Sequence, residues 1–168
     1  MAGVPLEAKR PVSAVLAGPY GHPYHPILVT IPIGAWACAL VFDIASRIVD
    51  DPAGLARGAR WLIALGVLGA AAAAAVGFLD LFAIPPGTPA FRTGLLHMSL
   101  NLAVTAAYVV NFLWRDESGA VPIGPIVLSA ASFLTLSYSG YLGGKLAFRY
   151  GVRVADEQTQ SEGYERKG

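Results

Sequence analysis

The sequence predicts an all-α integral membrane protein, a bundle of four transmembrane helices. Of its 168 residues, 55% are hydrophobic and 14% are charged, against roughly 45–50% and about 25% in soluble domains. Because about 20 apolar residues span the hydrocarbon core as a helix, each long run without Asp, Glu, Lys or Arg predicts one span. These runs are 17, 19, 22 and 27 residues long, at 26–42, 61–79, 93–114 and 118–144.

The length fits a single domain with two tails. We expect a flexible N-terminal arm over residues 1–20, a transmembrane domain over 21–154 and a disordered polar tail over 155–168. The tail has too little apolar surface to fold by itself. The four helices are expected at about residues 26–49, 60–84, 92–115 and 122–148.

Two of the three histidines directly precede the first span, in the stretch Gly21-His22-Pro23-Tyr24-His25-Pro26. The residue before a proline avoids the α region, whereas proline itself suits the first turn of a helix. We therefore expect His22 and His25 in a stiff, non-helical lead-in, with Pro26 opening the helix.

Small residues dominate the second span. Gly69, Ala73 and Gly77 recur every four residues, so they predict a face that another helix can approach closely. Asp80 follows about one turn before the pair Pro85-Pro86 ends this helix.

Two pairs of polar residues have the spacing of one helical turn. Asp43 and Arg47 are four residues apart at the far end of the first helix, where they either pair or reach separately to water. His97 and Asn101 have the same spacing in the third helix and share a face.

The two halves of the domain resemble each other. Each begins with a histidine, His25 or His97, and each second helix carries Gly, an aromatic residue and Leu, as Gly77-Phe78-Leu79 and Gly140-Tyr141-Leu142. The pattern suggests two related helical hairpins about an axis along the membrane normal.

An even number of spans places both termini on one side of the membrane. Basic residues near that side number six, Lys9, Arg10, Arg92, Lys145, Arg149 and Arg153, against four near the other, Arg47, Arg57, Arg60 and Arg115. This asymmetry favours both termini in the cytoplasm. The net charge of +1 argues against a nucleic-acid partner.

The alternation of spans brings polar residues from every helix into the half of the bilayer nearest the termini. They are His22, His25, Asp80, His97, Asn101, Tyr138, Ser139 and Lys145. Polar groups are costly within a membrane, so they tend to face a bundle interior or a cavity.

This polar layer admits three interpretations. His25 and His97 could bind haem b, or His22, His25, His97 and Asp80 could bind a transition metal ion, with Asn101, Tyr138 and Asp43 as supporting polar groups. Alternatively, the same groups relay protons or mark a substrate path. In the third interpretation they only hydrogen-bond between helices. No nucleophile–base constellation stands out, so an enzyme is the less favoured class.

Several motifs together resemble a bacterial membrane family catalogued as "domain of unknown function 2231". They are the stretch from Gly21 to Gly34, Asp43, Gly77 to Asp80, His97 with Asn101, and Gly140 to Val152. The resemblance implies a four-helix protein of the bacterial inner membrane with no assigned activity. Some relatives are joined to Rieske-type or cytochrome c-type domains, which implies electron transfer. This chain has neither set of ligands, so a redox role needs a non-covalent cofactor or an external redox protein.

The function expected from the sequence is therefore that of a multi-pass membrane protein of uncharacterised activity. Our leading hypothesis is a redox-associated protein with a haem- or metal-binding histidine cluster on one membrane side. The alternatives are a small transporter or proton- or ion-conducting protein, and a structural subunit of a larger membrane complex. The sequence does not define the oligomeric state.

Overall fold

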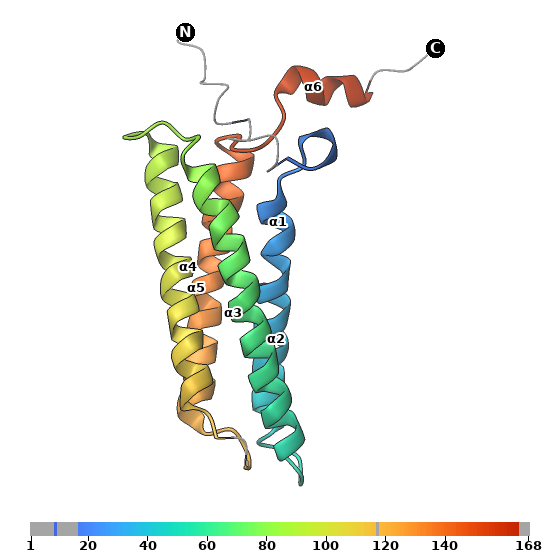
Figure 1. Ribbon diagram of the computed structural model, residues 1–168, viewed down its shortest axis with the longest axis vertical. Helices are drawn as coiled ribbons and strands as arrows, with labels where there is room; N and C mark the ends of the chain where they lie inside the picture. The colour runs from blue at the N-terminus through green and yellow to red at the C-terminus, as the bar shows by residue number, and fades with distance from the viewer. Residues whose placement is uncertain (1–8, 10–16, 117, 165–168) are drawn as a thin grey trace.

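Four long helices run side by side in the computed structural model, which describes residues 9, 17–116 and 118–164 (Figure 1). Residues 1–8 and 10–16 of the predicted arm lie outside the described part. The helices of the bundle are α1 (Tyr24–Leu28) with α2 (Thr30–Ala45), α3 (Ala53–Leu81), α4 (Pro89–Trp114) and α5 (Ile123–Phe148).

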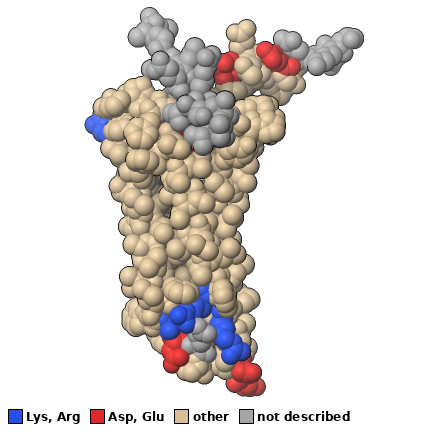
Figure 2. All heavy atoms as spheres, viewed as in Figure 1, with Lys and Arg blue, Asp and Glu red and all other residues tan. Residues whose placement is uncertain are grey.

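Consecutive helices alternate in direction, so α1 begins and α5 ends at the same end of the bundle (Figure 1). Four helical segments are long and apolar enough to cross a membrane. In the space-filling view, Lys, Arg, Asp and Glu gather towards the two ends and leave an uncharged belt between them (Figure 2). These features confirm the predicted four-helix membrane architecture.

The first helix begins earlier than the sequence predicts. Pro23 is its N-cap and α1 starts at Tyr24, so His25 lies in the first helical turn and our expectation of a non-helical His25 is wrong. The N–H groups of a first turn have no intrahelical acceptor, so Pro26 is tolerated there. The helix is interrupted at Val29. Pro32 has no N–H, so the carbonyl of Leu28, four residues earlier, lacks its helical hydrogen bond.

The other boundaries differ because apolar run length locates the membrane core rather than the helix ends. Helix α3 begins at Ala53 instead of about residue 60, since arginine is a good helix former and carries the helix beyond the apolar run. Helix α4 begins at Pro89 instead of about residue 92. Its N-cap Thr88 accepts a hydrogen bond from the Phe91 backbone N–H at 3.1 Å, a strong helix-start signal.

Helix α3 packs against α2 through its glycines. Trp36 lies directly over Gly66, and a Cβ at Gly69 would lie 2.6 Å from Ile31. Ala73 is buried on the same side. The small residues of α3 therefore accept the large side chains of α2, as the four-residue spacing predicts.

The centre of the bundle is a stacked aromatic pair that joins the two hairpins. The rings of Trp36 and Tyr108 lie nearly parallel, 11° apart, with centroids separated by 4.0 Å. Both side chains are fully buried. The surrounding cluster also contains Ala39, Ala59, Ile63 and Val104.

The two hairpins repeat the same contacts. Three residues of the first hairpin contact their own counterparts in the second: His25 and His97, Trp36 and Tyr108, Asp43 and Arg115. In each pair the residue numbers differ by 72. Equivalent residues meet each other only close to a symmetry axis. A pseudo-two-fold axis therefore runs along the bundle between α2 and α4.

The second helices of the hairpins, α3 and α5, are related by the same axis, and their equivalent residues differ by 66 in number. The Trp36 indole N–H donates to the Ile63 carbonyl at 3.3 Å, and the Tyr108 hydroxyl donates to the equivalent Ser129 carbonyl at 3.2 Å. These matched hydrogen bonds satisfy the polar ends of the two stacked rings.

The same shift corrects the repeat register that the sequence suggests. Gly77 lies against the His25 ring, and Gly143 lies against the His97 ring. The counterpart of Gly77 is thus Gly143 rather than Gly140, and the predicted alignment is three residues out. A short apolar match arises by chance, whereas an imidazole in van der Waals contact demands a glycine.

Two short helices, α6 (Glu157–Ser161) and a 3₁₀ turn (Glu162–Tyr164), occupy the described part of the predicted tail. Hydrogen bonds from the Thr159 N–H and side chain hold the pKa of the N-cap Asp156 below its usual range. Helices this short are marginal without tertiary packing. The disorder of this tail stays a prediction.

We expect Gly66→Ala to destabilise the protein and Gly140→Ala to leave it unchanged or slightly more stable. A Cβ at Gly66 clashes with Trp36, which costs about 1–3 kcal/mol of overpacking. At Gly140 nothing lies within 4 Å, so alanine adds helix propensity of about 0.5–1 kcal/mol. The measurement is thermal unfolding in detergent. Equal midpoints for the two variants would contradict the Trp36–Gly66 contact.

Candidate functional site

The histidine layer lies at the end of the bundle where α1 begins and α5 ends. His25 extends from α1 to α3, where its Nδ1 lies 2.8 Å from the Ala73 carbonyl oxygen. A Cβ at Gly77 would lie 2.8 Å from the ring, so the absence of a side chain there makes room for the imidazole.

His97 repeats this arrangement in the second hairpin. Its Nδ1 lies 2.8 Å from the Ser139 carbonyl oxygen, and a Cβ at Gly143 would lie 3.2 Å from the ring. The Asn101 amide donates to the His97 carbonyl and to the Ser139 hydroxyl oxygen, each at 2.8 Å. His97 is therefore held by more polar contacts than His25.

The two imidazoles meet edge to face, with ring centroids 6.2 Å apart and planes at 82°. A carbonyl oxygen only accepts hydrogen bonds, so each neutral ring carries its proton on Nδ1. The Nε2 atom of each ring then carries the lone pair, and in His97 the Asn101 amide nitrogen lies 3.3 Å from this atom. Hydrogen bonding of Nδ1–H to a backbone carbonyl is the usual way in which proteins orient a ligating histidine.

The remaining predicted ligands lie apart from this pair. His22 is in the lead-in, where its Nδ1 lies 2.9 Å from the Tyr20 hydroxyl. Asp80 forms an ion pair with Arg153, whose Nε lies 3.0 Å from Asp80 Oδ1. Within residues 17–116 and 118–164, no group of three His, Cys, Asp or Glu side chains is arranged to hold a metal ion.

The three supporting residues named from the sequence have different positions. Asn101 contacts His97 as described above. Tyr138 is exposed and stacks on Tyr141, with ring centroids 6.4 Å apart. Asp43 lies in the last turns of α2, at the opposite end of the bundle from the histidines.

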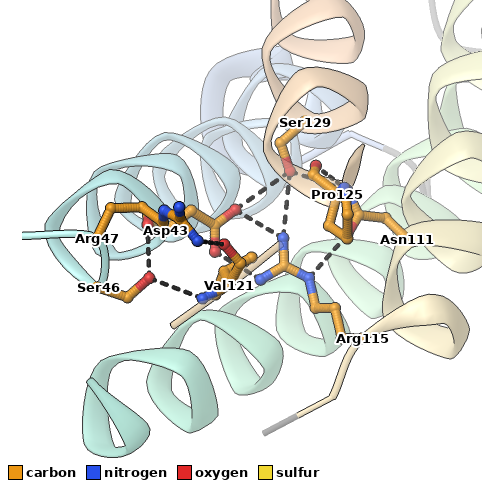
Figure 3. Close-up of polar contacts among 8 residues, drawn as sticks. All are labelled: Asp43, Ser46, Arg47, Asn111, Arg115, Val121, Pro125 and Ser129. Atoms are coloured by element: carbon orange, nitrogen blue, oxygen red, sulfur yellow. Dashed lines mark hydrogen bonds and ion pairs between the residues drawn. The ribbon is translucent and has the colours of Figure 1, made fainter. Parts of the chain in front are cut away.

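A second polar cluster surrounds Asp43 at that end (Figure 3). Arg115, the C-cap of α4, donates to both carboxylate oxygens of Asp43, at 2.5 and 2.6 Å. Its Nε donates to Asn111 Oδ1 at 2.7 Å. Asn111 in turn donates to the Pro125 carbonyl and the Ser129 hydroxyl oxygen. The ion pair and its neighbours therefore link α2, α4 and α5.

The cluster also fixes the chain that leads into α5. The Val121 N–H donates to the Ser46 hydroxyl oxygen at 3.1 Å, and Ser46 donates to the Asp43 carbonyl at 2.7 Å. Arg47 donates to the Val121 carbonyl at 3.4 Å. The structure thus pairs Asp43 with Arg115 instead of Arg47, because Arg115 offers a buried two-pronged contact.

The sequence analysis missed Arg115, Asn111 and Ser129 as members of a site. They are separated from Asp43 by many residues, and nearest-turn spacing cannot detect such a partner. The 72-residue shift between the hairpins is the signal that finds it, because this shift carries Asp43 onto Arg115. With its charges paired and hydrogen-bonded, the cluster is suited to holding the hairpins together.

We expect Asp43→Asn to destabilise the protein strongly. Removing one partner of a buried ion pair leaves the other charge uncompensated, which costs about 3–5 kcal/mol. Thermal unfolding in detergent measures the loss, and Asp50→Asn in the exposed loop is the control. The double variant Asp43→Asn with Arg115→Gln should lose less than the sum of the single variants. Additive losses would contradict direct coupling of the two side chains.

Comparison with known proteins adds the family of the chain. A family model described as "Predicted membrane protein (DUF2231)" matches residues 21–156. Neither the curated proteins nor the solved structures gave a match. The matched segment contains all four spans and both polar clusters. This chain therefore belongs to the DUF2231 family of predicted membrane proteins.

Proposed function

We propose that this protein holds one haem b between His25 and His97 and transfers electrons within the membrane. The observation that carries the proposal is the pair of equivalent imidazoles, 6.2 Å apart on the pseudo-two-fold axis. Histidine side chains are common ligands of haem iron. His25 and His97 would hold the iron, one from each hairpin.

The donor set supports haem over a bare metal ion. Zinc and similar ions need three or four protein ligands, and here Asp80 is paired with Arg153 while His22 contacts Tyr20. Two imidazoles alone satisfy haem iron, since the porphyrin supplies the other four nitrogens. The haem interpretation therefore needs no rearrangement of Asp80 or His22.

The two rings are neighbours, with centroids 6.2 Å apart. His25 and His97 would hold the iron only after turning from this edge-to-face contact so that both Nε2 atoms face the haem. The residues that contact the rings on α3 and α5 are small, namely Ala73, Gly77, Ser139 and Gly143. These small residues seat the two imidazoles against α3 and α5.

Bound haem supplies one-electron chemistry. The chain's own contribution is to fix the ligands: Ala73 and Ser139 carbonyls hold the Nδ1 protons, so that each Nε2 keeps its lone pair. The redox partner that we propose is an external protein docking at the histidine end, where the path to water is shortest.

We expect a Soret band when the detergent-purified protein is incubated with haem b, at one haem per chain. His25→Ala and His97→Ala should each shift the band and weaken haem binding, because each removes one of the two proposed ligands. His22→Ala is the matched control and should keep it, since His22 contacts Tyr20 in the lead-in.

The absence of a Soret band in the unaltered protein would contradict the proposal. So would a band whose position and haem affinity are unchanged in both single variants. In either case the role of the two imidazoles would be structural, namely to hydrogen-bond to α3 and α5.

We also propose that the protein resides in a bacterial inner membrane with both termini in the cytoplasm, on the basis of its Lys and Arg distribution. A fluorescent reporter fused after Ser161 should then be active. A phosphatase inserted into the loop at residues 50–54 should be active outside the cytoplasm. Activity of both reporters on the same side would contradict the three spans that separate them.

A further inference from the structure

The outer face of α5 carries a hollow that the histidine layer does not use. Its volume is about 850 Å³. The lining consists of aromatic and basic side chains around a glycine: Tyr141, Gly144, Lys145, Phe148, Arg149 and Tyr150. The apolar span of α5 ends at Phe148, so the hollow lies where the hydrocarbon region meets the headgroups.

The pseudo-two-fold repeat indicates that the fold does not require this hollow. By the 66-residue shift between α3 and α5, Phe78 is the counterpart of Gly144, and Leu79 is the counterpart of Lys145. In the first hairpin Phe78 packs edge to face on Phe82, with centroids 5.0 Å apart. The same position therefore holds packed rings in one hairpin and open space beside a cation in the other.

The two cations are not needed to complete the end of α5. Backbone N–H groups already occupy its last carbonyls: Gly151 donates to Ala147 at 3.1 Å and Val152 donates to Leu146 at 3.0 Å. Gly151 has φ +68°, which closes the helix as in a Schellman motif. The side chains of Lys145 and Arg149 are left to the hollow.

No acidic side chain contributes to the lining. In the described part of the chain, Lys145 contacts the Tyr150 ring, with its ammonium nitrogen 5.7 Å from the centroid. Neither cation has a hydrogen bond or an ion pair to any described residue. Two positive charges beside aromatic rings form a site of positive potential at the membrane boundary.

We propose that this hollow binds the phosphate group of an anionic phospholipid. Basic pockets at the headgroup level bind acidic lipids, and aromatic rings are enriched at the same depth. Lys145 and Arg149 face the phosphate, while Tyr141 and Phe148 lie along the upper acyl chains. Gly144 provides the space that Phe78 fills in the other hairpin.

The test is a titration of the detergent-purified full chain with short-chain phosphatidylglycerol, with the lipid-bound fraction measured by native mass spectrometry. We expect saturable binding of one lipid and about 30-fold weaker binding by Lys145→Gln with Arg149→Gln, from two lost charge contacts. Gly144→Phe keeps both charges and should also weaken binding, because the ring fills the hollow. Arg57→Gln, which lies at the opposite end, is the control.

Three results would overturn the proposal. Equal binding of phosphatidylglycerol and phosphatidylcholine would show that the site does not select an anionic headgroup. Inorganic phosphate that binds as tightly as the lipid would assign the site to a free anion. Unchanged binding in both the double variant and Gly144→Phe, with normal thermal stability, would place the lipid elsewhere.

Discussion

The pseudo-two-fold axis is the constraint on which the rest of this structure depends. A residue on such an axis contacts its own counterpart from the other hairpin. The two side chains of each pair must therefore either attract each other when alike or have complementary chemistry. Trp36 and Tyr108 solve the problem by stacking, with centroids 4.0 Å apart. Asp43 and Arg115 solve it by opposite charge. Two acids or two bases there would repel each other in a low dielectric. The axis thus determines the chemistry that each level of the bundle can hold.

Different contacts hold the ends and the middle of the bundle. Transfer of Asp43 and Arg115 out of water is costly, and their mutual attraction and hydrogen bonds offset that cost. Their network fixes α2, α4 and the start of α5 at one end. The stacked rings hold the middle. At the opposite end, each imidazole is hydrogen-bonded to the second helix of its own hairpin, and the two rings contact each other across the axis.

The membrane fold could be predicted from the sequence because charge-free runs report directly on the cost of burying charge in lipid. Helix ends could not be predicted in the same way. Thr88 and Pro23 set them through local hydrogen bonding and backbone restriction, outside the apolar runs. Of the site, His25, His97 and Asn101 follow from depth and one-turn spacing. Arg115 does not, since it meets Asp43 only after both hairpins have folded around the axis.

The hairpins differ at positions where the second hairpin has polar residues that hydrogen-bond to Arg115 or His97. Arg115 needs acceptors for its remaining N–H groups, so Asn111 and Ser129 stand where the first hairpin has Ala39 and Ile63. At the histidine level, Asn101 and Ser139 stand where the first hairpin has Val29 and Ala73. His97 is consequently fixed within a regular helix by an amide and a hydroxyl. His25 belongs to five-residue α1, which the break at Val29 separates from α2. Both imidazoles contact a backbone carbonyl through Nδ1, but His97 has additional hydrogen-bonding neighbours. His25 lies on a short helix, so a movement of α1 would change the position of its ring.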